Sequence, residues 1–221
     1  MGDYIPKLDT DCIDEELPDG WNSFMRFRLT FLGELPPVGG RGSEKNRVAE
    51  KWEVRRQTHH QLADLFAKHP ALCRESKLIT FSWGKEPPFL KAVREPIKVG
   101  AHDFIPLARK SLGLACELDI TYLRSGPPGS LITEAGDLDN HMNTLFDGLH
   151  IPKPDVLDRG GIIPKPMYCL LEDDSMVTGL TVRTDRLLAP ADTSEFYAHL
   201  IIDVNIKVLE PSGSNAGFMG D

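Results

Sequence analysis

The stretch that decides the fold is GDLDNHMNTLFDGL, residues 136–149, followed after an irregular segment by LLEDDSMVTGLTVR, residues 170–183. In the first stretch an aspartate or asparagine can cap a helix, and the apolar residues then recur at helical spacing. This pattern predicts a helix from about residue 139 to 150 with one apolar face. The second stretch predicts strands at 168–171 and 176–183, interrupted by Glu172-Asp173-Asp174.

The segments on either side of these stretches complete a mixed fold. Alternation of apolar and polar residues predicts strands at 25–31, 114–123 and 196–209, a short apolar run predicts another at 78–83, and an apolar stripe before Pro70 predicts a long helix at about 44–68. We therefore expect the α/β class, of the α+β type, with a mixed sheet and two principal helices. We expect residues 1–20 to form an acidic tail, 21–209 a single domain and 210–221 a flexible tail.

Composition excludes several classes of protein. The chain has 221 residues and a net charge of −8, and no apolar run approaches the length of a membrane span. Residues 1–20 carry −6 of that charge, whereas residues 68–110 carry +5, so the charge is segregated along the chain. The N-terminus does not resemble a signal peptide, and the four cysteines are far apart. We expect a cytoplasmic protein without a zinc knuckle or a disulfide framework.

Carboxylates are the chemically most informative residues. Asp137 and Asp139 open the predicted helix, Asp147 lies two turns later on the same face as Asp139, and Asp173 and Asp174 occupy the strand break. If the break folds back onto the N-terminus of the helix, these side chains converge. Such a cluster suits Mg²⁺ or Mn²⁺ and in-line phosphodiester hydrolysis. The alternative is structural: the first two cap the helix, and the last two form a turn.

The order of these motifs resembles the RusA-like Holliday junction resolvases. The similarity lies in a strand, a turn, Asp-x-Asp-Asn, an apolar helix with an aspartate in its second half, a strand that enters Asp-Asp, and two closing strands. It covers residues 114–209 well and 24–70 loosely, with insertions at about 71–113 and 151–167. The resemblance implies a homodimeric, Mg²⁺-dependent endodeoxyribonuclease that cuts branched DNA, above all Holliday junctions, in DNA recombination and repair.

The resemblance also assigns roles to residues. Asp137, Asp139 and Asp174 would be the catalytic carboxylates and the metal ligands, with Asp173 beside them as a further catalytic candidate. Asn140, Asn143 and Asp147 would be supportive.

The chain departs from the family at one of these positions. Asn143 occupies the place of a family lysine that would stabilise negative charge at phosphate. Lys153 or Lys165, each in a Pro-Lys-Pro tripeptide, is a candidate substitute cation. Otherwise the site binds metal and DNA yet cuts slowly.

Two functions follow as expectations. One is metal-dependent cleavage of branched DNA by a homodimer. The other is a catalytically weak or inactive RusA-like module that binds DNA or a protein. In both cases we expect DNA contacts from the long helix and from the basic 68–110 segment, through Lys45, Arg47, Lys51, Lys91, Arg94 and Lys98.

Some polar residues receive a structural interpretation. Arg55 and His59 fall on the apolar stripe of the long helix, where we expect the arginine to extend toward solvent and the histidine to pack. We also expect His141 and His150, which flank the carboxylate helix, to be packed or exposed and not ligands.

Overall fold

The computed structural model describes residues 25–36, 44–69, 71–72, 88–124, 138–188 and 196–212, together with 215 and 218. Its strands are β1 (Arg26–Glu34), β2 (Ile97–Val99), β3 (His102–Ala108), β4 (Leu114–Arg124), β5 (Met167–Leu171), β6 (Val177–Arg186) and β7 (Tyr197–Val208). Its α-helices are α1 (Glu44–Lys68), α3 (Pro88–Arg94) and α5 (Leu138–Leu149). Short 3₁₀ turns are η1 (Lys110–Leu112), η2 (Pro154–Arg159) and η3 (Asp174–Met176).

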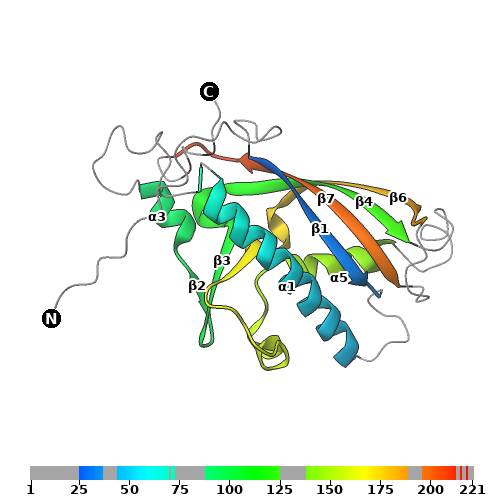
Figure 1. Cartoon of the computed structure of the whole chain (residues 1–221). Helices are drawn as coiled ribbons and strands as arrows, with labels where there is room; N and C mark the ends of the chain where they lie inside the picture. Colours follow the sequence, from blue (N-terminus) through cyan, green and yellow to red (C-terminus); the bar gives the residue numbers. More distant parts are fainter. Residues whose placement is uncertain are drawn as a thin grey trace.

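The larger sheet has the strand order β1-β7-β4-β6 (Figure 1). β7 pairs antiparallel with β1 and with β4, whereas β6 runs parallel to β4 along its outer edge. The alternation in the sequence explains the two faces of these strands. Leu29 and Phe31 of β1 are buried, whereas Arg28 and Thr30, which alternate with them, are exposed. The expected α+β class is confirmed.

A second, three-stranded sheet has the order β2-β3-β5. β3 pairs parallel with β5, which precedes the Asp-Asp break. The sequence assigned residues 71–113 to an insertion, but its strands β2 and β3 share this sheet with β5. The described part of that segment is therefore joined to the main fold by backbone pairing.

Helices α1 and α5 pack together on one face of the larger sheet (Figure 1). Apolar residues of both helices share one core with the strands, among them Leu62 of α1 and Leu145 of α5, neither of which is exposed. Gly148 marks the closest approach of α5 to α1, because a Cβ at this glycine would lie 2.5 Å from Cβ of Val54. The two helices that carry most of the candidate site residues are thus held in direct contact.

Helix α1 also protects the outer edge of β1. The Gln61 side chain accepts from the backbone N–H of Thr30 and donates to its carbonyl, at 2.9 and 2.8 Å. Gln57 makes the same pair of bonds with Leu32, at 3.1 and 2.9 Å. Two side-chain amides therefore take the place of a neighbouring strand, which is one way to block edge-to-edge pairing.

The remaining sequence expectations have mixed outcomes. The helices and strands expected at 44–68, 114–123 and 196–209 are present within one or two residues of the expected bounds. The expected strand at 78–83 and the acidic tail lie outside the described residues. Two residues of the segment expected as a flexible tail, Asn215 and Phe218, are buried instead. In the described part of the chain, no helix is long and apolar enough to cross a membrane.

Candidate functional site

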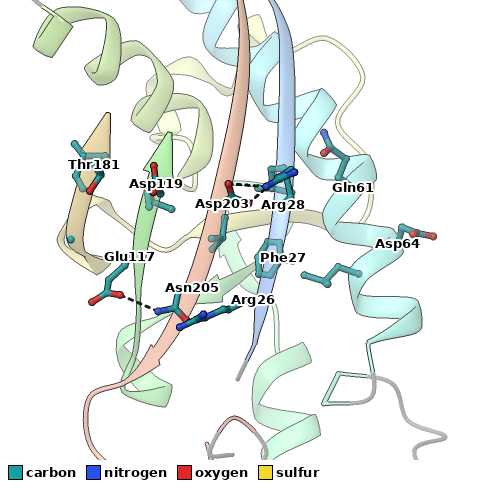
Figure 2. Close-up of a pocket in the computed structure, with 16 residues that line it drawn as sticks. Arg26, Phe27, Arg28, Gln61, Asp64, Glu117, Asp119, Thr181, Asp203 and Asn205 are labelled. Atoms are coloured by element: carbon teal, nitrogen blue, oxygen red, sulfur yellow. Dashed lines mark hydrogen bonds and ion pairs between the residues drawn. The ribbon is translucent and has the colours of Figure 1, made fainter. Parts of the chain in front are cut away.

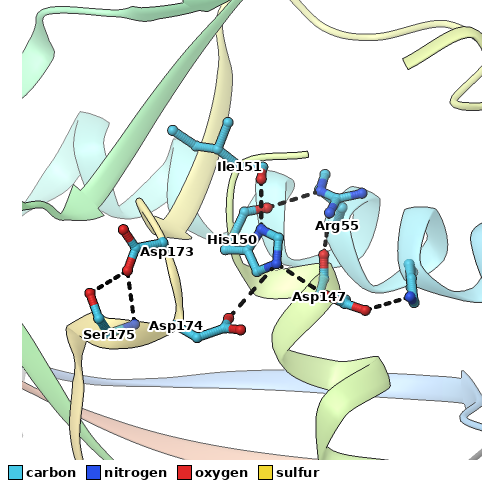
Figure 3. Close-up of polar contacts among 8 residues, drawn as sticks. Arg55, Asp147, His150, Ile151, Asp173, Asp174 and Ser175 are labelled. Atoms are coloured by element: carbon cyan, nitrogen blue, oxygen red, sulfur yellow. Dashed lines mark hydrogen bonds and ion pairs between the residues drawn. The ribbon is translucent and has the colours of Figure 1, made fainter. Parts of the chain in front are cut away.

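Two carboxylates and an imidazole meet at the C-terminal end of α5 (Figure 3). His150 Nε2 lies 3.1 Å from Asp147 Oδ1 and 3.8 Å from Asp174 Oδ1. Its other ring nitrogen, Nδ1, lies 2.6 Å from the carbonyl oxygen of Ile151. A carbonyl only accepts, so Nδ1 carries a proton and Nε2 faces the two carboxylates.

Asp147 is the most strongly engaged of these carboxylates. Burial opposes its ionisation, but its contacts with His150 and with the ammonium of Lys51 outweigh that effect and lower its pKa to about 2. Asp147 therefore stays ionised at neutral pH. Asp174 is more open, with 63% of its side chain exposed.

Arg55 of α1 also contacts the C-terminal end of α5. Its Nε donates to the carbonyl of His150 at 3.2 Å, and its Nη2 donates to the carbonyl of Asp147. Carbonyls at a helix C-terminus lack intrahelical partners, so Arg55 caps α5. The guanidinium also lies 4.7 Å from the ring centre of Trp52. Only 2% of Arg55 is exposed, and this burial lowers its pKa to about 10.

Asp173 points to a different set of partners (Figure 3). Its carboxylate forms an ion pair with Lys110 at 2.7 Å and accepts from the backbone N–H of Ser175 at 2.8 Å. These contacts lower its pKa to about 2. The Asp173–Ser175 bonds form a turn, as the structural alternative for this pair predicted.

Asp139 lies at the opposite end of α5 from Asp174. Two residues after Asp139, the ring of His141 lies 6.1 Å from the ring of Tyr122, near the end of β4. Asp174 begins η3, which directly precedes β6, and the first residue of β6 is paired with Cys116 near the start of β4. Cys116 and Tyr122 are six residue steps apart along β4, which corresponds to about 20 Å.

The strand break thus folds onto the C-terminal end of the helix, not onto its N-terminus. The expected convergence of Asp139 with Asp173 and Asp174 does not occur within one chain. Asp137, the remaining expected metal ligand, lies outside the described residues.

The described residues do not fit the divalent metal ion that the sequence suggested. Among them, no three histidine, cysteine, aspartate or glutamate side chains are grouped so that they could hold an ion. The tightest candidate group, Asp147 with His150, is already engaged by the ammonium of Lys51. Asn140 and the exposed Asn143 lie with Asp139 in the first half of α5, away from this group.

A cation-lined pocket adjoins the Asp147–His150 pair. It has a volume of about 360 Å³ and lies between α1 and η2. Five basic residues line it against two acidic ones, Asp147 and Asp155; the basic ones are Arg47, Lys51, Arg55, Lys153 and Arg159. We call it the α1–η2 pocket. Its lining therefore carries an excess of positive charge next to the candidate site.

The basic residues expected to bind DNA, or to substitute for the family lysine, lie at different places in the structure. Arg47, Lys51 and Lys153 line the α1–η2 pocket, and Lys165 does not. Lys91 and Lys98 are exposed on α3 and β2. Arg94 has a structural role, since it donates to the backbone carbonyls of Leu72 and Phe66. The side chain of Lys45 lies outside the described residues.

A larger, open hollow of about 1240 Å³ covers the outer face of the four-stranded sheet (Figure 2). Acidic side chains outnumber basic ones in its lining: the acidic ones are Asp64, Glu117, Asp119 and Asp203, and the basic ones are Arg26 and Arg28. Arg28 binds Asp203 at 2.8 Å, and Glu117 accepts from Asn205 at 3.0 Å. This face therefore offers less unpaired positive charge to a phosphate than the α1–η2 pocket does.

Sequence reasoning missed the roles of Arg55 and His150. Arg55 is a buried helix cap and does not extend toward solvent, and His150 joins two carboxylates. The signal for Arg55 was present, because a charged residue on an apolar stripe needs buried partners. The prediction for His59 is confirmed: its Nδ1 accepts from the backbone N–H of Tyr168 at 3.0 Å, and the two rings stack.

No protein-family model, curated protein or solved structure matches the chain in the three comparisons made. The likeness to RusA-like resolvases therefore rests on the sequence motifs.

Proposed function

We propose that this protein binds branched DNA as a homodimer and holds it by the backbone phosphates. The observation that carries the proposal is the α1–η2 pocket, where basic residues gather at the end of the helix that bears the Asp-x-Asp-Asn motif. Basic side chains that contact phosphate supply most of the affinity of a protein for DNA. The motif order supports branched DNA as the particular substrate.

Binding is favoured over cleavage by two features. Asp139 and Asp174 lie at opposite ends of the sheet, so the described residues of one chain do not assemble a metal centre. Asn143 also stands where the resembling family has a lysine. A neutral amide stabilises charge at a phosphate less well than an ammonium does.

Metal-dependent cleavage is the second candidate, and the order of the motifs favours it. It requires carboxylates that are distant in one chain, so a second copy would have to complete each site. Asp139 of one copy would then act together with Asp174 of the other. A two-fold dimer presents two such sites to a two-fold junction.

The test of binding uses a labelled four-way junction and a linear duplex of the same sequence. In a gel-shift titration we expect tighter binding of the junction and an affinity that falls steeply with salt. The combined variant Arg47→Ala/Lys153→Ala should weaken binding, whereas the matched variant Arg183→Ala/Lys165→Ala should not. Equal loss in both variants, or no binding of the wild type, would refute the proposal.

The test of cleavage adds Mg²⁺ or Mn²⁺ to the same junction. Asp139→Asn and Asp174→Asn should each abolish nicking. When the two inactive variants are mixed and allowed to exchange subunits, a shared site predicts recovery of about a quarter of the wild-type sites. No recovery despite confirmed exchange would contradict the two-copy site, and no nicking by the wild type would exclude the second candidate.

A further inference from the structure

The α1–η2 pocket has the size of a small-molecule site. At about 360 Å³ it lies in the usual range for pockets that hold a ligand, roughly 300–1,000 Å³. A phosphate group alone would fill only a fraction of that space. The dimensions point to a ligand that carries an anionic group and a further, larger part.

The walls of the pocket are fixed to each other. Trp52 of α1 donates its indole N–H to the carbonyl of Val156 in η2, at 3.2 Å. Gly160 packs directly against the same indole, because a Cβ at this glycine would lie 2.4 Å from the ring. Since η2 is held on α1 by a hydrogen bond and by close packing, the pocket is formed before any ligand arrives.

The base of the pocket contains a buried positive charge. Arg55 is 2% exposed, and its hydrogen bonds go to two backbone carbonyls. Within the described residues, no ion pair joins its guanidinium to a carboxylate. A buried charge without a direct counter-ion is costly, and an anion in the pocket would reduce that cost.

The rim adds cations and an apolar wall. Arg47, Lys153 and Arg159 form no ion pair in the part of the chain that the structure describes, so they are available to a ligand. Val48 and Val156 line the same space and give it an apolar side. Cations for a phosphate next to an apolar wall suit a molecule with a charged end and a flat, less polar end.

We propose that the α1–η2 pocket binds one nucleoside monophosphate unit. The phosphate contacts Arg47, Lys153 and Arg159, and the base lies against the wall formed by Val48 and Val156. This inference rests on the proposed function in one respect, that the unit belongs to a DNA strand. A free mononucleotide carries the same chemical groups and could occupy the pocket instead, and the experiment distinguishes these two occupants.

The experiment titrates the full chain with thymidine monophosphate, inorganic phosphate and thymidine, with calorimetry as the readout. We expect the monophosphate to bind at least about tenfold more tightly than either fragment, because it alone uses both the cations and the apolar wall. Lys153→Ala and Arg159→Ala should each weaken that binding severalfold. Lys165→Ala is the matched control, since this lysine has the same Pro-Lys-Pro context but does not line the pocket.

The outcomes separate this inference from the proposed function. Displacement of the monophosphate by a single-stranded oligonucleotide or by the junction supports a nucleotide of the strand as occupant. If the monophosphate binds but DNA does not, the pocket stands with a free nucleotide as its ligand, and the proposed function fails. If phosphate binds as tightly as the monophosphate, or if DNA binds while the monophosphate does not, the nucleotide pocket is refuted. Circular dichroism of each variant verifies that it is folded.

Discussion

The contact between Gly148 and Val54 offers a decisive test of how the site is held together. Helix propensity alone predicts that Gly148→Ala stabilises α5 by about 1 kcal/mol. The structure predicts the opposite sign. A Cβ at residue 148 would lie 2.5 Å from Cβ and 2.6 Å from Cγ1 of Val54, and 3.1 Å from the carbonyl oxygen of Lys51.

None of these obstructing atoms is easily moved. The Cβ of Val54 does not move when its side chain rotates, Val54 is fully buried, and the third atom belongs to the backbone of α1. The two helices must therefore separate. Overpacking of a filled core costs about 1–3 kcal/mol. Two of the contacts here are shorter than 3.0 Å, so we expect a cost in the upper half of that range, about 2–3 kcal/mol, and a net loss of about 1–2 kcal/mol after the gain of about 1 kcal/mol in propensity.

The assay is denaturant unfolding of the wild type, Gly148→Ala, Val54→Ala and the double variant. Val54→Ala makes room for the new methyl group, so the double variant should lose less stability than the sum of the two single losses, by about 0.5–3 kcal/mol. The reasoning is wrong if Gly148→Ala is as stable as the wild type, or if the two losses simply add. Junction affinity should fall with Gly148→Ala as well, because α1 and α5 carry opposite sides of the site.

Four further outcomes are expected. The pKa of Asp147 in the folded protein is about 2, below its ordinary 3.8, so its ionised form contributes stability above about pH 4 that is lost as the pH falls toward 2. The free energy of unfolding of Asp147→Asn should therefore decline less steeply over that pH interval than that of the wild type. Burial lowers the pKa of His69 from 6.5 to about 4, so on acidification the unfolded chain binds a proton at this histidine before the folded protein does, and stability falls between pH 6.5 and 4. In His69→Asn the free energy of unfolding should depend less on pH over this range. Gln57→Ala/Gln61→Ala should cost about 1 kcal/mol per residue and expose the β1 edge, which analytical ultracentrifugation would detect as self-association. In the junction-cleavage assay Asn143→Lys should raise the rate of nicking, and an unchanged rate would show that the missing lysine does not limit the reaction.

The sequence predicted those elements whose pattern is local. Alternation over 114–123 predicted β4, and the apolar stripe before Pro70 predicted α1, because both patterns report which side chains are buried within one element. The pairing of β3 with β5 was not predictable in this way. It joins residues more than sixty positions apart, and nothing in residues 71–113 alone indicates their partner.

In the candidate site, too, the sequence predicted the local features but not the long-range contacts. Helical spacing correctly placed Asp147 in the second half of α5, but it carried no information on which end of the helix receives the strand break. His150 follows the last turn of α5, where Asp147 is a neighbour at helical spacing, whereas Asp174 reaches it only through the chain reversal. Its position between Asp147 and Asp174 therefore required the tertiary structure.

The parallel pairing of β4 with β6 explains why Asp139 and Asp174 are separated. A connection between two parallel strands must leave from the end of the first and return to its beginning. Helix α5 is the first described element of this connection and its N-terminal half lies near the end of β4, whereas η3, which directly precedes β6, lies near the beginning of β4. In this topology Asp174 can meet only the C-terminal part of α5, where Asp147 and His150 are found. A cluster that joins Asp139 to Asp174 then needs a second copy in the opposite orientation, which is the arrangement that the subunit-mixing experiment tests.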